Sequence, residues 1–167
     1  PAMKRAKRYP FCKILRQRLD LHFDNQSSAQ APAENQFRLW IWQAVKRHYR
    51  RAEISLILLD EPAARACNRD YRGKDYATNV LSFALDEGET CAPLSDGLHG
   101  DLVICPQIVL KEAAEQGKTP EQHYAHLTIH GTLHLMGYDH IEDTEAEEME
   151  TLETELLNQL AYPDPYK

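Results

Sequence analysis

Four short hydrophobic stretches of the chain have the length and spacing of β-strands. The segment "LDLHF" alternates hydrophobic and polar residues, which is typical of a strand with one buried face. The segment "EISLILLD" is hydrophobic almost throughout, so we expect this strand to be buried on both faces. The strands predicted in this way cover residues 19–23, 53–60, 79–85 and 100–106. Small and polar residues predict loops at 25–35 and 86–97.

Five further segments repeat their hydrophobic residues at helical spacing or start with helix-initiating residues. The predicted helices cover residues 35–49, 61–72, 106 to about 116, 119 to about 136, and 144 onward. The fourth helix is the best marked, because Thr119 and Gln122 form a capping signal and Gly137 can end the helix. We expect the last helix to turn its glutamates to water and to bury a stripe made of Ala146, Met149, Leu152, Leu156 and Leu160.

The mixed order of strands and helices predicts an α+β fold, in which about five helices pack on a small mixed β-sheet. With 167 residues, the chain is long enough for one domain with a full core and too short for two. We expect a basic N-terminal extension at 1–13, followed by a single domain at 14–167.

Charge is unevenly distributed along the chain, whose formal net charge is −7. The first 50 residues carry 11 Lys/Arg and 3 Asp/Glu, a net of +8, whereas residues 101–167 carry 3 and 14, a net of −11. This distribution fits either an acidic solvated helix beside a basic arm, or a local basic surface for phosphate on an acidic protein.

The four scattered cysteines form no Cys-x2-Cys pair, which favours free thiols over disulfides or a second metal site. Neither a membrane span nor a signal peptide is expected, because charged residues interrupt every hydrophobic stretch too early.

The segment "HGTLHLMGYDH" concentrates three histidines at metal-ligand spacing. His130 and His134 are four residues apart and therefore lie on one face of a helix. Gly137 ends that helix, so the following turn can bring His140 back as a third ligand. Structural zinc sites usually fill all four positions with protein, often with cysteine, whereas catalytic sites leave one open. The sequence therefore predicts one zinc ion per chain in a catalytic site on a helix and the turn after it.

Two neighbours of this motif have open roles. Asp139 either orients a ligating histidine, or accepts a proton beside the metal, or caps the turn. His126 lies on roughly the same helical face as the ligands, and it either supports a ligand, or touches the substrate, or serves as a packing or solvent residue.

Gly131 occupies the position at which His-Glu-x-x-His proteases carry their catalytic glutamate. Amide hydrolysis needs that residue to protonate the leaving amine, so peptide cleavage is disfavoured. A phosphodiester instead needs charge stabilisation and an activated nucleophile, which a cationic site supplies. The segment "NRDYRGKDYATNVLSF" adds Arg72 and Lys74 as candidate phosphate contacts. Arg72 has an alternative role, a surface salt bridge with Asp70 or Asp75.

The two segments "HGTLHLMGYDH" and "NRDYRGKDYATNVLSF", together with "GDLVIC", resemble the YbeY family of bacterial endoribonucleases, also called rRNA maturation factors. The resemblance runs from about residue 14 to 166, and its three motifs occur in the family's order. It implies a cytoplasmic, ribosome-associated endoribonuclease that depends on zinc and cleaves single-stranded RNA. It further implies roles in ribosomal RNA processing, chiefly 16S 3′-end maturation, and in ribosome quality control. By match, the metal ligands are His130, His134 and His140, and the family's functional arginine is Arg72.

The sequence thus predicts a catalytic domain in which Arg72, Lys74 and Asp139 assist a three-histidine zinc site, with ribosomal RNA and the ribosome or its small-subunit proteins as partners. Two alternatives stay open: a metalloprotease-like hydrolase with an unusual base, and a non-catalytic ribosome-assembly factor with structural zinc. The oligomeric state, and whether water or the RNA 2′-hydroxyl attacks, are not determined by the sequence.

Overall fold

The computed structural model describes residues 18–85 and 97–167, which form four strands and five helices. In chain order the elements are β1 (Arg18–Asn25), α2 (Glu34–Val45), β2 (Arg51–Leu58), α3 (Glu61–Arg72), β3 (Val80–Ala84), β4 (Leu98–Ile104), α4 (Pro106–Gln116), α5 (Pro120–Leu135) and α6 (Asp143–Gln159). The predicted extension at 1–13 and residues 86–96 of the predicted loop at 86–97 lie outside the described residues.

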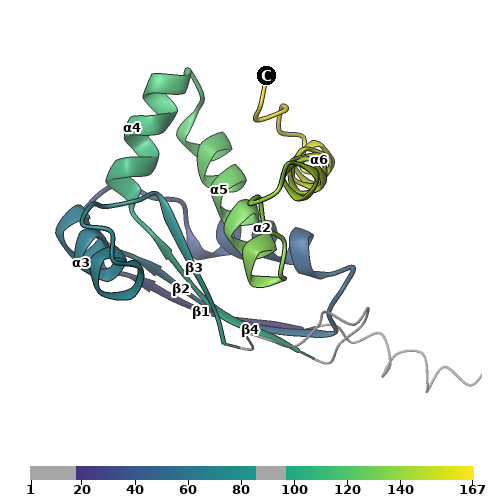
Figure 1. Ribbon diagram of the computed structural model, residues 1–167, viewed down its shortest axis with the longest axis horizontal. Helices are drawn as coiled ribbons and strands as arrows, with labels where there is room; N and C mark the ends of the chain where they lie inside the picture. Colours follow the sequence, from purple (N-terminus) through teal and green to yellow (C-terminus); the bar gives the residue numbers. More distant parts are fainter. Residues whose placement is uncertain (1–17, 86–96) are drawn as a thin grey trace, which may run out of the picture.

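The strands form one mixed sheet in the order β1-β2-β4-β3. Strands β1, β2 and β4 are parallel to one another, and β3 pairs antiparallel with β4 at one edge. Figure 1 shows the sheet below a layer of helices. The predicted α+β class, with a small mixed sheet and about five helices, is confirmed.

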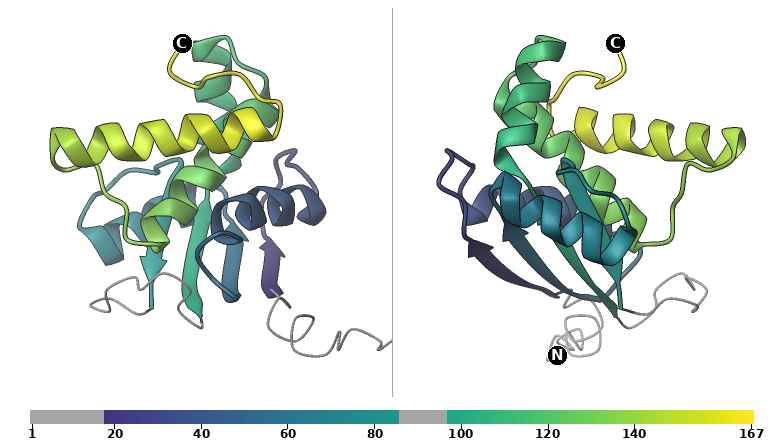
Figure 2. Two further views of the ribbon diagram at one scale, coloured as in Figure 1. Left: turned by 90° about the vertical axis from the view of Figure 1, so that its right-hand side faces the viewer. Right: turned by 60° about the vertical axis from the view of Figure 1, so that its left-hand side comes forward.

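Helices α2 and α5 cover one face of the sheet, contacting each other as well as the strands, while α3 lies on the opposite face (Figure 2). Helix α6 crosses α5 on the side away from the sheet. The main core lies between the sheet and the α2/α5 pair. Its largest fully buried side chains are Phe37, Trp40, Ile41, Ile54, Leu56, Leu58, Leu102, Ile104, Tyr124, Ile129, Leu133 and Met149.

The expectation that β2 is buried on both faces was wrong. Ala52, Ile54, Leu56 and Leu58 are buried, but the residues between them are exposed or half-buried. The buried set faces α2 and α5. Of the described elements, only α3 lies over the other face, and α3 buries just two of its own residues, Ala64 and Asn68. A thin cover of this kind leaves the second face of β2 partly accessible.

Other boundaries differ from the prediction by a few residues. Helix α2 ends at Val45 rather than at 49, and the chain turns over residues 46–48, although Tyr49 is still buried. In α6, Met149 and Leu156 are buried as predicted, but Ala146, Leu152 and Leu160 of the predicted stripe are only half-buried. Among the described cysteines, Cys67 and Cys105 are free thiols. Within the described ranges, no helix has both the length and the hydrophobicity to cross a membrane.

Candidate metal centre

Helix α5 carries the two histidines of the i, i+4 pair, and both of its ends are fixed by local hydrogen bonds. At its start, the Thr119 hydroxyl accepts from the Gln122 backbone N–H, and the Gln122 side chain accepts from the Thr119 N–H, which completes the predicted capping box. At its end, Gly137 has φ +97°, and the N–H of Tyr138 donates to the carbonyl of Leu133. This αL ending turns the chain back toward the helix.

Gly131 brings α5 close to the edge of the sheet. A Cβ at this position would lie 2.9 Å from Val80 Cγ2 and 3.0 Å from Leu102 Cδ2. The Ser82 hydroxyl on β3 donates to the Gly131 carbonyl at 2.9 Å. The position that carries a glutamate in His-Glu-x-x-His proteases therefore faces β3 and β4 in this chain and leaves no space for a side chain.

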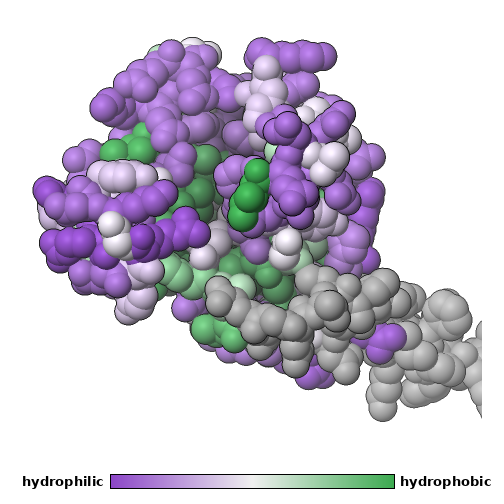
Figure 3. Space-filling view, viewed as in Figure 1, coloured by the Kyte–Doolittle hydropathy of each residue, from purple (hydrophilic) through white to green (hydrophobic). Residues whose placement is uncertain are grey.

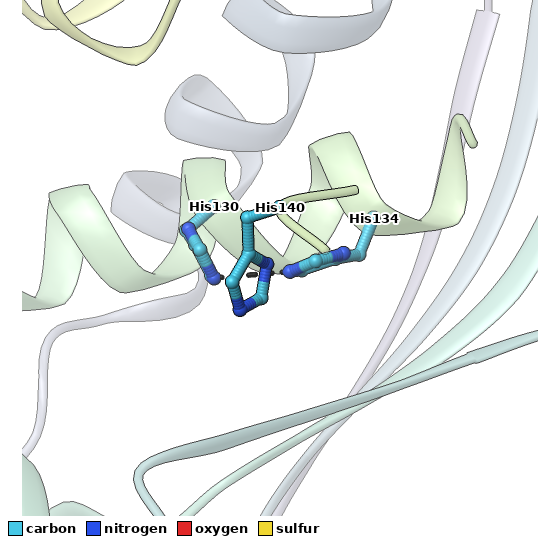
Figure 4. A group of neighbouring side chains, drawn as sticks. All are labelled: His130, His134 and His140. Atoms are coloured by element: carbon cyan, nitrogen blue, oxygen red, sulfur yellow. Dashed lines mark hydrogen bonds between the residues drawn. The ribbon is translucent and has the colours of Figure 1, made fainter. Parts of the chain in front are cut away.

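The three histidines converge on one side of α5 (Figure 4). His130 and His134 project from the helix, and His140 comes from the loop that follows it. Their ring centroids are 4.6–5.7 Å apart, and one nitrogen from each ring lies within 4.8 Å of the others. The structure thus brings together all three residues that the sequence singled out as ligands.

The donor set fits a metal ion. The Nε2 atoms of His130 and His134 face each other at 3.1 Å. Two nitrogens bound to one tetrahedral zinc, at about 2.0–2.1 Å from it, would be about 3.3 Å apart. Burial lowers the pKa of His134, and the neighbouring His130 and His140 lower it further, which favours the neutral imidazole that metals bind. Within the described part of the chain, no fourth His, Cys, Asp or Glu joins this group, so the three-histidine set leaves a coordination position for an external ligand.

Asp139 lies in the turn between Gly137 and His140. Its Oδ1 accepts from the backbone N–H of His140 at 2.7 Å and lies 3.7 Å from the Nδ1 of that histidine. The hydrogen bond matches the capping role that the sequence left open. The longer distance to the ring places the carboxylate beside a candidate ligand without a hydrogen bond to it.

Arg72 and Lys74 lie at the end of α3 and just beyond it, and both are exposed. The anticipated alternative, a salt bridge from Arg72 to Asp70 or Asp75, does not occur. Asp75 instead pairs with Arg65, and Asp70 pairs with Arg69. Among the described residues, Arg72 has neither a hydrogen bond nor an ion pair, so its guanidinium is available.

Contacts through β3 connect the end of α3 with α5, although Arg72 itself does not touch the histidines in the described structure. The ring of Tyr71, next to Arg72, contacts the ring of Phe83 on β3 at a centroid distance of 5.5 Å. Ser82, adjacent to Phe83, bonds Gly131, which follows His130. Figure 3 shows the face seen in Figure 1 as largely hydrophilic, with hydrophobic side chains gathered in a recess beside α5.

The sequence prediction missed Glu153 on α6. All glutamates of this helix were expected to face water, but the Glu153 side chain is 0% exposed. It bonds His130 Nδ1, His126 Nε2 at 3.1 Å and the Tyr166 hydroxyl. Burial alone raises the pKa of Glu153, but the hydrogen bonds from His126 and His130, the charge of His130 and the bond from Tyr166 outweigh it and lower the pKa to about 2. A detectable signal existed, because Glu153 is four residues after Met149 and three before Leu156, within the buried stripe.

Two further histidines, His123 and His126, lie on α5 before the candidate ligands. His123 is buried and bonds Glu112 of α4 at 2.9 Å, which is a packing role. His126 bonds the same Glu153 that contacts His130, so it is linked to the metal-ligand candidates through one side chain.

Comparisons with known proteins identify the family. The sequence model described as Endoribonuclease YbeY matches residues 22–161. A protein named Endoribonuclease YbeY from Neisseria meningitidis serogroup B is 68% identical over 167 residues, covering 99% of this chain and 99% of its own length. A protein of the same name from Chromobacterium violaceum is 53% identical over 98% of this chain and 97% of its own length. The solution structure of a Thermotoga maritima protein is 25% identical, covers 88% of this chain and 99% of that chain, and has a TM-score of 0.51. The chain therefore belongs to the endoribonuclease YbeY family, as its three motifs predicted.

Proposed function

We propose that the chain is a zinc-dependent endoribonuclease that cleaves single-stranded RNA, with the three histidines as its metal centre. The observation that carries this proposal is the convergence of His130, His134 and His140 in a member of an endoribonuclease family, with no further ligand from the described residues. The metal would be one zinc ion per chain, because neutral imidazoles with an open position suit zinc best among the common metals. When bound, zinc supplies positive charge and Lewis acidity at the scissile phosphate.

The chain's own residues would hold and orient the RNA around that centre. Arg72 is exposed and unpaired among the described residues, and its planar guanidinium can bind two phosphate oxygens at once. Lys74, one residue past Gly73, adds a second cation. Asp139, beside His140, would steady that ligand through the turn or accept a proton from the attacking group.

The substrate in the cell would be ribosomal RNA. The motifs shared with the YbeY family support a role in 16S 3′-end maturation and in ribosome quality control. Contact with the ribosome or with small-subunit proteins, in the cytoplasm, follows from that substrate. Residues 14–167 would act as one catalytic domain, and the basic residues at 1–13 would add positive charge for RNA.

Two other functions have less support. A metalloprotease would need a base beside its zinc, and Gly131, where the glutamate would lie, is packed against β3 and β4. An assembly factor with structural zinc would be expected to complete the coordination with a fourth protein ligand, which the described residues do not add to the histidine group.

The test combines zinc content with RNA cleavage. His134→Ala should lose most bound zinc and most single-turnover cleavage of a short single-stranded RNA. Full zinc retention in the three single variants His130→Ala, His134→Ala and His140→Ala would refute the metal site. Cleavage of casein that disappears in His134→Ala would favour the protease instead.

Arg72 can be tested against a matched control on the same helix. A charge-assisted hydrogen bond is worth about 1.5–3 kcal/mol, so Arg72→Ala should slow RNA cleavage roughly 10- to 150-fold. Arg72→Lys should recover part of the rate, because lysine keeps the charge but loses the planar fork. Arg65→Ala removes another exposed arginine of α3, one that is already paired with Asp75, and it should leave the rate within about twofold. Equal rates for Arg72→Ala and Arg65→Ala would remove Arg72 from the mechanism.

A further inference from the structure

Glu153 is a fully buried carboxylate that connects three elements. It lies on α6, contacts His126 and His130 on α5, and receives the hydroxyl of Tyr166 from the segment that follows α6. A charge with 0% exposure is rare unless it is paired and hydrogen-bonded, and this one has several donors. Each of these contacts is therefore a hydrogen bond in which the Glu153 carboxylate is the acceptor.

The hydrogen-bond pattern fixes which ring nitrogen of His130 carries a proton. An ionised carboxylate only accepts hydrogen bonds, so the Nδ1 of His130 must be the N–H donor to Glu153. In the neutral form of the ring, which is the form that binds a metal, Nε2 then presents its lone pair toward His134 and His140. By the same logic, the Nε2 of His126 is a donor. Its Nδ1 then carries a lone pair, which agrees with the absence of any partner for that atom among the described residues.

The C-terminal segment, residues 160–167 after α6, also contacts Glu153. Tyr166 donates to the carboxylate, and its ring contacts His126 at a centroid distance of 5.4 Å. Two more bonds fix the segment near the start of α5, one from Lys118 just before the helix and one to Glu121 in its first turn. The Lys118 ammonium donates to the Pro165 carbonyl at 2.6 Å, and the Tyr162 hydroxyl donates to Glu121 at 2.7 Å. The end of the chain is thereby linked to a candidate metal ligand through one side chain.

We propose that Glu153 is a positioning residue of the metal centre, and that Tyr166 holds Glu153 in place. Glu153 sets the tautomer and the ring orientation of His130. Tyr166 keeps the carboxylate turned toward that ring, so the C-terminal segment contributes to zinc affinity without touching the metal. This inference rests on the proposed metal centre.

Two substitutions separate this role from ordinary packing. Glu153→Gln keeps the shape, but its amide nitrogen cannot accept a hydrogen bond, so one of the donors around it loses its acceptor. Changes to residues that orient a metal ligand typically weaken metal binding about 10- to 100-fold, and we expect a loss of that size for Glu153→Gln. Tyr166→Phe acts one step further from the metal, and we expect a measurable loss of zinc affinity that is smaller than the loss in Glu153→Gln. The control is Tyr124→Phe, which removes a hydroxyl from α5 that bonds the Gln30 carbonyl instead, and it should leave zinc affinity unchanged.

The measurements are zinc affinity by competition with a chromogenic chelator and nitrogen NMR of the histidine rings in the metal-free, full-length protein. In the wild type, His130 should be protonated at Nδ1, and in Glu153→Gln it should shift toward Nε2. A purely structural role for Glu153 would lower the melting temperature but leave this tautomer and the zinc affinity of the folded protein unchanged, which would overturn the proposal. Unchanged affinity in Tyr166→Phe would overturn the part assigned to the C-terminal segment.

This result is distinguishable from failure of the metal centre itself. If His134→Ala keeps its zinc, the centre is wrong whatever Glu153 does. If His134→Ala loses zinc while Glu153→Gln binds it as tightly as the wild type, the centre stands and the positioning role is refuted. If Glu153→Gln does not fold, Tyr166→Phe and the wild-type His130 tautomer still test the proposal, because protonation of His130 at Nε2 would contradict it.

Discussion

A methyl group added at Gly131 should destabilise the protein, although alanine is normally the better helix former. In an exposed helix, Gly→Ala gains about 1 kcal/mol from backbone propensity. Here the new Cβ would lie 2.9 Å from Val80 Cγ2, on a stiff β-branched side chain, and 3.0 Å from a fully buried Leu102. The Ser82 hydroxyl, which bonds the Gly131 carbonyl, would lie 3.2 Å from it.

The expected loss of stability in Gly131→Ala is the sum of these effects. Overpacking of a tight contact costs about 1–3 kcal/mol. Loss of the Ser82 hydrogen bond costs about 1 kcal/mol, which roughly cancels the helix-propensity gain. Gly131→Ala should therefore lower the free energy of unfolding by roughly 1–3 kcal/mol, equivalent to about 2–12 °C in melting temperature. Urea unfolding of the metal-free protein, followed by circular dichroism, measures this directly because zinc binding would otherwise add to the apparent stability.

A double-mutant cycle tests whether the contact with β3 is the cause. Val80→Ala removes the nearest atom, so Gly131→Ala should cost at least about 0.5 kcal/mol less in that background than in the wild type. Additive effects would place the clash elsewhere. A Gly131→Ala protein about 1 kcal/mol more stable than the wild type would refute the close approach of α5 to the sheet.

Three further predictions concern stability. Leu156→Ala should cost roughly 2–5 kcal/mol as a core truncation, and the half-buried Leu152→Ala clearly less, both measured by denaturant unfolding; equal losses would contradict the burial pattern of α6. Thr119→Ala should lower the free energy of unfolding by about 1 kcal/mol, because it removes the capping box. A clearly smaller loss would show that the Thr119 hydroxyl is not the cap. Hydrogen bonds, chiefly from Gln107 and then from Ser27, lower the pKa of Asp60 to about 2, so its stabilising contribution is complete above pH 4 and is lost as the pH falls toward 2. The stability difference between the wild type and Asp60→Asn should narrow over that interval, and a difference that is constant from pH 5 to 2 would contradict this assignment.

The elements that the sequence predicted well are those whose signals are local. The capping residues at 119–122 and the glycine at 137 determine where α5 begins and ends, whatever the rest of the chain does. The burial of β2 was predicted less well. A hydrophobic run of that length can be covered on two faces or on one, and the choice depends on how much of the sheet α3 covers. That coverage is a tertiary property.

Among the site residues as well, local sequence signals could be interpreted from the sequence, whereas tertiary contacts could not. The histidine spacing places the three rings together through helix geometry and one turn, so the sequence was sufficient to predict the cluster. Glu153 was missed because carboxylates are seldom buried without partners, and its partners His126 and His130 lie on a different helix. For Arg72, the sequence offered two nearby aspartates as partners, and only the folded geometry shows that Arg65 and Arg69 pair with them.

The central claim is that the three-histidine centre holds the zinc on which RNA cleavage depends. Single-turnover cleavage of a short single-stranded RNA should be followed with the purified protein, the same protein after zinc removal by a chelator, and the stripped protein titrated with zinc. We expect cleavage to be lost on stripping and to return in proportion to zinc up to one ion per chain, with His134→Ala inactive at every zinc concentration. Undiminished cleavage by the stripped protein, or by His134→Ala, would contradict the claim.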